Sequence, residues 1–246
     1  MTWRAFGSPG DLDLDFHSAD RPVLVSRVLA TCRSGCDPAE ALEQAWSLSL
    51  GARIGALAEI LARTGEEDAL VVPLTCPRCA EPFEVRLSLA AIGELGREAR
   101  GPRVEVRLAD GPRLALRRPT GADQRRWLAD PDLEEADVLN DLLLEGDMPA
   151  QAPGLLARVA EAMAEADLLP AFAVHSACPH CGHADDLPLD LEGLLLARLA
   201  GQARRLIRAV HRLASRYGWR EADILALPGH RRAAYLDLLD QEGTWP

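Results

Sequence analysis

Two Cys-Pro-x-Cys pairs constrain this chain more than any other feature of its sequence. The first pair is Cys76 and Cys79, and the second is Cys178 and Cys181. A Cys-x-x-Cys turn places two thiolates on one side of a tight loop, so two such turns supply the four sulfur ligands that Zn²⁺ favours. Roughly 100 residues separate the pairs, against about 15 to 20 in a usual zinc ribbon. We therefore expect an inserted subdomain whose two ends lie close together.

The sequences around the two pairs resemble each other. Thr75-Cys-Pro-Arg-Cys79 leads into an alternating segment at 83–89, and Ala177-Cys-Pro-His-Cys181 leads into a related segment at 185–191. This weak internal repeat is typical of two half-sites that share one function. We predict that the four cysteines bind a structural zinc ion, because four thiolates leave no coordination position open for catalysis.

Two other interpretations of the cysteines remain. Cys-Pro-His-Cys also occurs in thiol oxidoreductases, where it begins a helix that lowers the pKa of the attacking thiol. The segment Gly182-His-Ala-Asp-Asp-Leu-Pro188 is a poor helix start, so zinc is favoured over redox chemistry. The other alternative is two cysteine turns without metal.

Residues near the second pair, and a third cysteine pair, add further candidates. Three histidines surround the second pair: His175, His180 and His183. They could bind the metal or hydrogen-bond to its ligands. We favour a third interpretation, that they are ordinary polar residues of an exposed loop. Cys32 and Cys36 lack a second partner pair, so we expect them to be small buried hydrophobic residues.

The pattern of apolar residues predicts an α+β fold that is mainly helical, with a small zinc-knuckle β unit formed by the two distant turns. We expect a helical region at 1–68, the β unit with an inserted hairpin and an acidic helical subdomain at 69–191, and a helical region at 192–246. Strands are predicted at 69–75, 83–89, 104–108 and 114–116, the last two flanking an Asp110-Gly111 turn. Helices are predicted at 191–217, 221–227 and 230–239, and a short strand or extended arm at 11–16.

Composition limits the classes of function. The 246 residues carry a formal charge of −11 and are 48% hydrophobic, which is typical of a globular protein with little affinity for nucleic acid. No apolar run has the length of about 18 to 20 residues that spans a bilayer, so we expect a cytoplasmic protein. We find no phosphate-binding glycine loop, serine nucleophile elbow or zinc-protease motif, and we predict no enzymatic activity and no small-molecule substrate.

A row of arginines near the C-terminus is the most distinctive charge feature. Arg204, Arg208, Arg212 and Arg216 recur every four residues along the predicted helix at 191–217 and should form an arginine ridge on one side of it. The apolar stripe of the same helix is expected to contain Leu199, Ala203, Leu206, Ile207, Val210, Leu213 and Ala214. Trp219 and Tyr235 are expected to pack the terminal helices against this helix. The ridge is either a solvated face or a docking surface for an acidic partner.

Several short motifs are spread along the chain: Leu50-Gly-Ala-Arg53, Leu116-Arg-Arg-Pro-Thr-Gly-Ala-Asp-Gln124 before Trp127, the two cysteine pairs, Ile207-Arg-Ala-Val-His-Arg-Leu-Ala214, Tyr217-Gly-Trp219, and Asp223-Ile-Leu-Ala-Leu227 followed by Arg231 and Tyr235. Together they resemble the baseplate or hub-assembly proteins of contractile-tailed phages and related contractile injection systems. The matching segments extend from about residue 40 onward. Family members often carry Ser where Arg220 stands, so one helix cap differs.

The resemblance implies a non-enzymatic role in building a baseplate through contacts with other tail proteins. The first alternative is a zinc-ribbon adaptor or regulatory protein that binds nucleic acid or an acidic protein through the arginine ridge. The second alternative is a thiol oxidoreductase, which would depend on Cys178. These three hypotheses place the functional residues in different parts of the chain.

Overall fold

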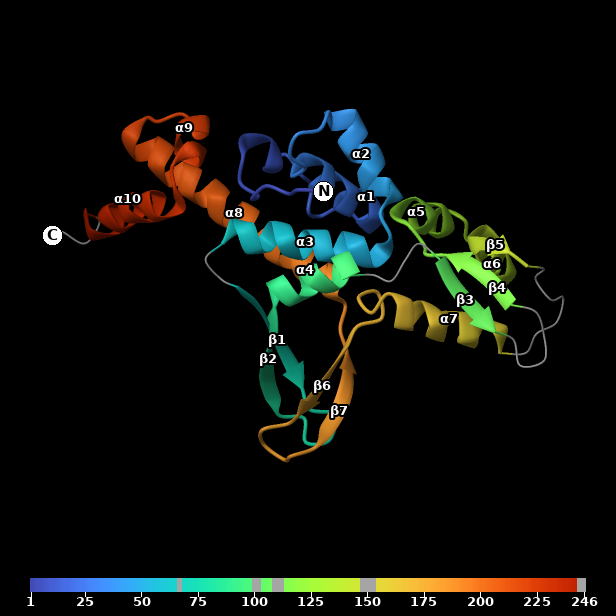
Figure 1. The fold of residues 1–246 in the computed structure, drawn as a ribbon. Coiled ribbons are helices and arrows are strands. Elements are labelled where there is room, and N and C mark those ends of the chain that lie inside the picture. Colours follow the sequence, from blue (N-terminus) through green and yellow to red (C-terminus); the bar gives the residue numbers. More distant parts are fainter. Residues whose placement is uncertain (66–67, 99–102, 108–112, 147–153, 243–246) are drawn as a thin grey trace.

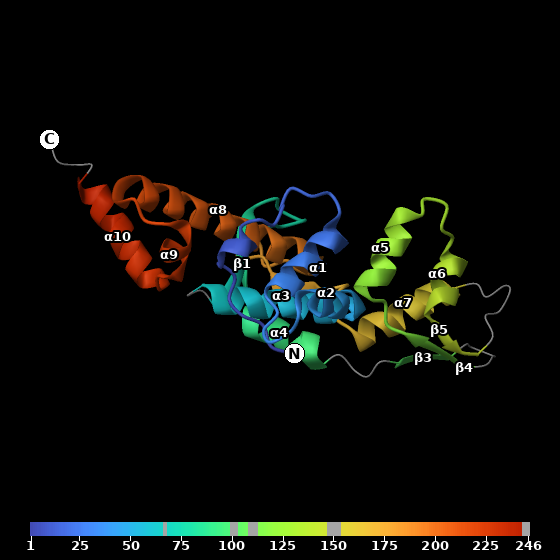
Figure 2. The same cartoon turned by 90° about the horizontal axis from the view of Figure 1, so that it is seen from above.

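The computed structural model in Figure 1 describes residues 1–65, 68–98, 103–107, 113–146 and 154–242. It is an α+β fold with small antiparallel sheets, and the fold class predicted from the sequence is confirmed. A helical core lies at the centre of the molecule. A prong of two β-hairpins projects from one side of the core, an inserted α/β unit lies at one end, and a C-terminal helical unit lies at the other (Figures 1 and 2).

The helical core is built on α3, whose residues Leu57 and Ile60 are fully buried. It comprises α1 (Arg21–Thr31), α2 (Pro38–Ser47), α3 (Leu50–Thr64), α4 (Leu89–Glu98) and the first half of α8 (Leu191–Tyr217). Side-chain caps define the helix starts: Asp37 accepts a hydrogen bond from the Ala39 N–H, and Pro38 occupies the first helical position. The predicted bounds of α8 are also confirmed.

Helices α3 and α4 cross at close range because glycines meet at the contact. A Cβ atom added at Gly96 would lie 2.7 Å from the Cα of Gly55 and 3.0 Å from the carbonyl oxygen of Gly51. No side chain fits at that distance, so the absence of a Cβ is what allows the two backbones to touch. This crossing holds α4 against the core, and strand β2 of the prong ends immediately before α4.

The prong consists of two antiparallel hairpins. Strand β1 (Ala69–Thr75) pairs with β2 (Pro82–Ser88), and β6 (Ala173–Ala177) pairs with β7 (Ala184–Pro188). The prediction of β1 matches its observed bounds, and that of β2 is displaced by one residue. Leu70 and Val72 anchor β1 in the main core, whereas β6 and β7 contain no buried residue. The outer half of the prong therefore has almost no hydrophobic core of its own.

The inserted unit has a separate hydrophobic core. Its described elements are β3 (Arg103–Arg107), β4 (Arg113–Arg117), α5 (Gly121–Ala129), α6 (Glu135–Leu142), β5 (Leu143–Glu145) and α7 (Leu155–Ala166). Strand order is β3-β4-β5, and Leu114, Leu116 and Val159 lie at the centre of the buried cluster. The predicted pairing of the first two strands is confirmed, while the Asp110-Gly111 turn lies outside the described residues.

The C-terminal unit is formed by the end of α8 with α9 (Glu221–Ala226) and α10 (Gly229–Glu242). Trp219 stacks on Tyr217 with ring centroids 4.9 Å apart, and Tyr235 of α10 meets the Trp219 ring edge-on at 5.0 Å. Gly218, with φ of 70°, ends α8 in a left-handed conformation that turns the chain back. The aromatic packing expected of Trp219 and Tyr235 is confirmed.

The N-terminal segment departs from the prediction. Residues 9–11 form a turn of 3₁₀ helix, and no strand forms between Asp11 and Phe16. The Asp11 side chain is fully buried, and it accepts hydrogen bonds from Arg4 at 2.6 and 2.7 Å and from the Gly7 N–H at 2.7 Å. The alternating acidic residues suggested an extended segment. One of them, Asp11, instead provides the buried carboxylate that holds the N-terminal loop together.

Candidate metal centre

The four predicted cysteine ligands lie in the turns at the tips of the two hairpins. In the first turn, the Ala80 N–H donates to the Cys76 carbonyl at 2.9 Å, and the Cys76 N–H donates to the Glu81 carbonyl at 3.0 Å. In the second turn, the Gly182 N–H donates to the Cys178 carbonyl at 2.9 Å, and the Cys178 N–H donates to the His183 carbonyl at 2.8 Å. The weak sequence repeat is therefore also a repeat of backbone structure.

In both turns, the residue that follows the second cysteine has a left-handed backbone conformation. Gly182 has a φ of 71°, and Ala80, the equivalent residue of the first turn, has a φ of 60°. An L-residue in this conformation costs about 1–2 kcal/mol because its Cβ approaches the backbone. Ala80 is the one non-glycine residue with positive φ among the described residues, so the first turn carries local strain at the metal-binding loop.

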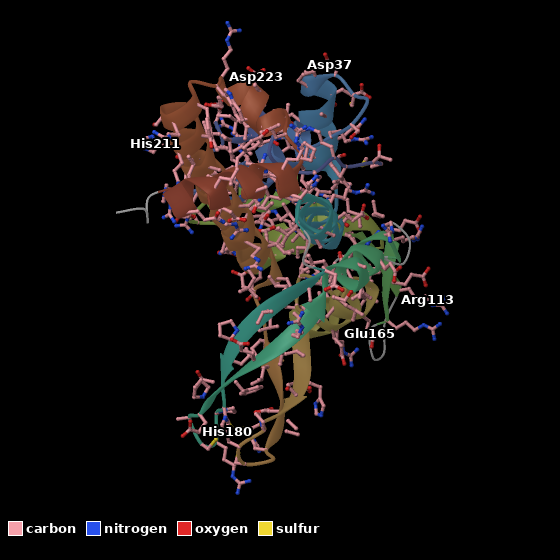
Figure 3. All side chains as sticks on the ribbon, turned by 90° about the vertical axis from the view of Figure 1, so that its left-hand side faces the viewer. Asp37, Arg113, Glu165, His180, His211 and Asp223 are labelled. Carbon is pink, nitrogen blue, oxygen red and sulfur yellow. The ribbon has the colours of Figure 1, made fainter. Side chains whose placement is uncertain are left out.

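The two turns bring the four sulfur atoms into one cluster. The Sγ atoms of Cys76 and Cys181 lie 3.7 Å apart, as do those of Cys79 and Cys178, and all four lie within 4.8 Å of one another. Four sulfurs arranged tetrahedrally about an ion at about 2.3 Å would be about 3.8 Å apart. Figure 3 shows sulfur beside His180, at the far tip of the prong. The cluster therefore has the size of a four-thiolate metal site.

The electrostatics of the cluster favour a bound cation. Hydrogen bonding from the Cys79 backbone N–H, followed by that from Arg78, lowers the pKa of Cys76 to about 6. At Cys79 the Glu81 backbone N–H favours the thiolate, but desolvation and the neighbouring thiols raise the pKa to about 12. Four thiols this close cannot all ionise by themselves, and a metal ion would compensate the charge and displace the remaining protons.

The histidines near the second turn are not part of the cluster. His175 pairs with Asp186 at 2.8 Å across the β6–β7 ladder, and His183 lies 3.8 Å from Asp185. The backbone N–H of His180 donates to the Cys178 sulfur at 3.4 Å. In the described part of the chain, the only group with metal-ligand spacing contains the four cysteines. Of the six cysteines, Cys32 is buried in the main core as expected, whereas Cys36 is only half-buried.

The surroundings of the cysteines differ from those of a redox motif. Both pairs sit between antiparallel strands, so no helix begins at Cys79 or Cys181 and no helix dipole activates a thiol. Four thiolates complete a tetrahedral shell and leave no position for a substrate or a reactive water. The arrangement suits a structural ion that joins two hairpins distant in sequence.

The predicted arginine ridge combines exposed residues with an ion pair to α10. Arg204 and Arg208 are exposed on successive turns of α8, and Arg216 is exposed near its end. Arg212 forms an ion pair with Asp240 of α10, so its charge helps to hold α10 against α8. The apolar stripe is confirmed at Leu199, Ala203, Leu206 and Leu213, which are buried. Ile207 is an exception: 49% of its surface is exposed, next to Arg208.

A buried arginine that the sequence analysis did not single out as functional lies at the centre of the fold. Arg53 is fully buried; its Nη1 donates to the Ser26 hydroxyl at 2.9 Å and to the Ala45 carbonyl at 2.7 Å, and its Nη2 donates to the Pro22 carbonyl at 2.8 Å. Burial lowers its pKa to about 10, opposed by the nearby Glu192.

Arg53 joins two segments that appear as separate motifs in the sequence. The Leu50 N–H donates to the Pro119 carbonyl at 3.1 Å, and the Gly121 N–H donates to the Leu48 carbonyl at 3.1 Å. A Cβ atom at Gly121 would lie 2.2 Å from Nη1 of Arg53, so the guanidinium needs a glycine there. No local sequence signal marks this contact, because Gly121 lies far along the chain from Arg53.

No helix of the described residues is both long enough and apolar enough to cross a bilayer. Comparison with known proteins gives no match among family models, among curated proteins or among solved structures.

Proposed function

We propose that this chain is a non-enzymatic structural or assembly component of the baseplate of a contractile tail-like particle, stabilised by a structural zinc ion. The observation that carries the proposal is the meeting of two motifs around Arg53. The segments 50–53 and 116–124 support the resemblance to baseplate and hub-assembly proteins, and they are hydrogen-bonded neighbours. Gly121 of the second segment packs against the buried guanidinium of Arg53 in the first, so the two motifs form one structural unit.

The four-sulfur cluster supports a structural role for the metal. Tetrahedral sites of four sulfurs are typical of zinc or iron–sulfur centres, and of these we propose a single zinc ion. Cys76 and Cys178 are buried, Cys79 is half-buried and Cys181 is exposed, so an ion would be covered by protein on one side and lie near the surface on the other. The zinc ion would fasten the two hairpins to each other, while contacts with partners would use other surfaces.

The shape of the molecule also supports an assembly role. The C-terminal unit, the inserted unit and the prong lie at three separate extremities (Figures 1 and 2). Figure 3 shows His211 and Asp223 of the C-terminal region far from His180 at the prong tip. A protein with separate projecting surfaces can contact several neighbours at once. In the proposed role the chain acts in the cytoplasm, either within the particle or as a chaperone of its assembly.

Co-purification tests the proposal. The tagged chain would be co-expressed with the baseplate, hub, sheath, tube and spike proteins of the same genome, and we expect at least one baseplate or hub protein to be retained. The double variant Arg204→Glu, Arg208→Glu should weaken retention, because it reverses the exposed charge of α8. Arg113→Glu, an exposed change on the inserted unit, is the matched control. A folded chain that retains none of these proteins would refute the proposal.

The exposed arginines also support a second candidate, an adaptor that binds nucleic acid or an acidic protein. Arg204 and Arg208 lie one helical turn apart, with Ile207 exposed between them. Binding through these residues would weaken as the salt concentration rises. An electrophoretic mobility assay at low salt separates the candidates: a shift of DNA or RNA that Arg204→Glu abolishes would favour the adaptor, and unchanged mobility would exclude its nucleic-acid form.

A further inference from the structure

The four cysteines at the tip of the prong differ in their exposure to solvent. Cys76 and Cys178 are only 2% and 3% exposed and Cys79 is half-buried, whereas Cys181 is exposed. His180, the residue before Cys181, is also exposed, and Figure 3 places it at the far tip of the prong. Of the four cysteines, Cys181 is therefore the most open to a small dissolved reagent.

The sulfur of Cys181 is paired with a sulfur of the other hairpin. Its Sγ atom lies 3.7 Å from that of Cys76, and the Sγ atoms of Cys79 and Cys178 form a second pair between the hairpins at the same distance. A disulfide has a sulfur–sulfur separation of about 2.05 Å, so each pair needs to close by only about 1.7 Å. Strands β6 and β7 contain no buried residue, so the second hairpin can shift by this amount without unpacking the helical core.

We propose that Cys181 is the site at which hydrogen peroxide oxidises this metal centre, and that the product is a Cys76–Cys181 disulfide that joins the two hairpins in place of the metal. The reaction takes place at sulfur, so it needs no open coordination position on the metal. It also consumes the cysteines once, unlike the turnover of a thiol oxidoreductase. The inference goes beyond the proposed assembly function and does not depend on it.

The oxidation has two steps. The Cys181 thiolate attacks one oxygen of the peroxide; the O–O bond breaks, hydroxide leaves, and the sulfur becomes a sulfenic acid. The Cys76 thiolate then attacks the Cys181 sulfur; the S–S bond forms, the S–O bond breaks, and a second hydroxide leaves. In sum, two thiolates lose two electrons, and one hydrogen peroxide becomes two hydroxide ions. A second peroxide oxidises Cys79 and Cys178 in the same way, and the metal is released because its thiolate ligands are gone.

The two cysteines outside the cluster are internal references for the reactivity of Cys181. Burial raises the pKa of Cys32 to about 12, and desolvation together with a hydrogen bond to Glu40 raises the pKa of Cys36. Both side chains therefore remain thiols near neutral pH, whereas a metal ligand is held as the thiolate, which is the reactive form. We expect Cys181 to be oxidised at least about tenfold faster than Cys36.

Mass-spectrometric mapping of the metal-loaded full chain tests the order and the product of oxidation. The chain would be treated with one equivalent of hydrogen peroxide, with and without dimedone, which traps sulfenic acids, and then digested without reduction. With dimedone, the first labelled residue should be Cys181. Without dimedone, the main disulfide should link the peptides that contain Cys76 and Cys181.

Hydrogen exchange tests whether the disulfide takes the place of the metal. In the presence of a strong chelator, peptides from β6 and β7 should exchange slowly in the oxidised chain and fast in the unoxidised chain. The variant Cys76→Ser removes the partner of Cys181, so the dimedone adduct at Cys181 should increase. The matched control Cys36→Ser should behave as the unmodified chain does.

Three results would overturn the proposal. They are a main disulfide other than Cys76–Cys181, such as one within a single turn; first oxidation at a cysteine other than Cys181; and fast exchange of β6 and β7 in the oxidised chain. None of them bears on the assembly role. Failure of the co-purification would likewise leave the peroxide chemistry of the prong tip intact.

Discussion

Removal of the metal should loosen the outer prong while leaving the helical core folded. In β1, burial ends at Val72, and the next buried residue along the chain is Cys76. In the β6–β7 hairpin neither strand has a buried residue, and Cys178 is the buried residue of the turn between them. Without an ion, little apolar burial remains to hold the two tips together.

The size of the effect follows from this distribution. A two-stranded hairpin by itself is marginally stable, with an opening free energy of about 0–1 kcal/mol. Structural zinc contributes about 10–16 kcal/mol of apparent binding free energy in zinc-finger peptides, so opening of the metal-bound prong is limited by global unfolding at about 5–15 kcal/mol. Metal removal should therefore lower the local opening free energy by at least about 4 kcal/mol, or about 10³-fold in amide exchange rate.

Hydrogen exchange followed by mass spectrometry, with and without a strong chelator, measures this change. Peptides that cover β6 and β7 should exchange about 10³-fold faster after chelation, whereas peptides from α3 should keep their protection. The variant Cys36→Ser, which changes a cysteine outside the cluster, should behave as the unmodified chain does. Equal exchange of the prong with and without chelator would refute the reasoning, because some other interaction would then hold the tips.

Three substitutions and one control variant test other parts of the account. Gly96→Ala should lower the free energy of unfolding by about 1–3 kcal/mol in urea denaturation, because its Cβ would meet the Gly55 backbone; Gly201→Ala, in an uncrowded part of α8, should instead be neutral or stabilising by up to about 1 kcal/mol. Arg53→Met should cost about 3 kcal/mol or more, since buried carbonyls lose their donor, and a smaller loss would show that the Arg53 hydrogen bonds matter little. Ala80→Gly should tighten metal binding about fivefold in a chelator competition, a gain of about 1 kcal/mol, by relieving the left-handed strain; unchanged affinity would contradict the strain argument.

Local signals in the sequence predicted the elements well. The bounds of β1 and α8 were predictable because strong start signals precede clear apolar periods, such as the Asp190 cap before Leu191. The cluster of four cysteines was predictable because each of the two similar turns supplies two of the four sulfur ligands that a zinc ion favours. Neither turn had another cysteine turn of the same kind to pair with. In both cases the information lies within a few residues of the element that it specifies.

Contacts between distant segments were harder to predict. The burial of Arg53 depends on the missing side chain of Gly121, which no local pattern reveals. Asp11 carried the pattern of an exposed strand, yet its carboxylate is buried because Arg4 and the neighbouring backbone N–H groups converge on it. Ile207 followed the apolar period of α8 but is exposed, although the adjacent Leu206 is buried in the main core.

The metal content of the purified chain tests the central claim most directly. Elemental analysis of protein purified without added metal should find one zinc ion per chain, and the paired variant Cys79→Ser, Cys178→Ser should contain none while its helical core remains folded. Unmodified protein that is folded yet metal-free and binds no added zinc would contradict the account, as would zinc that the paired variant retains.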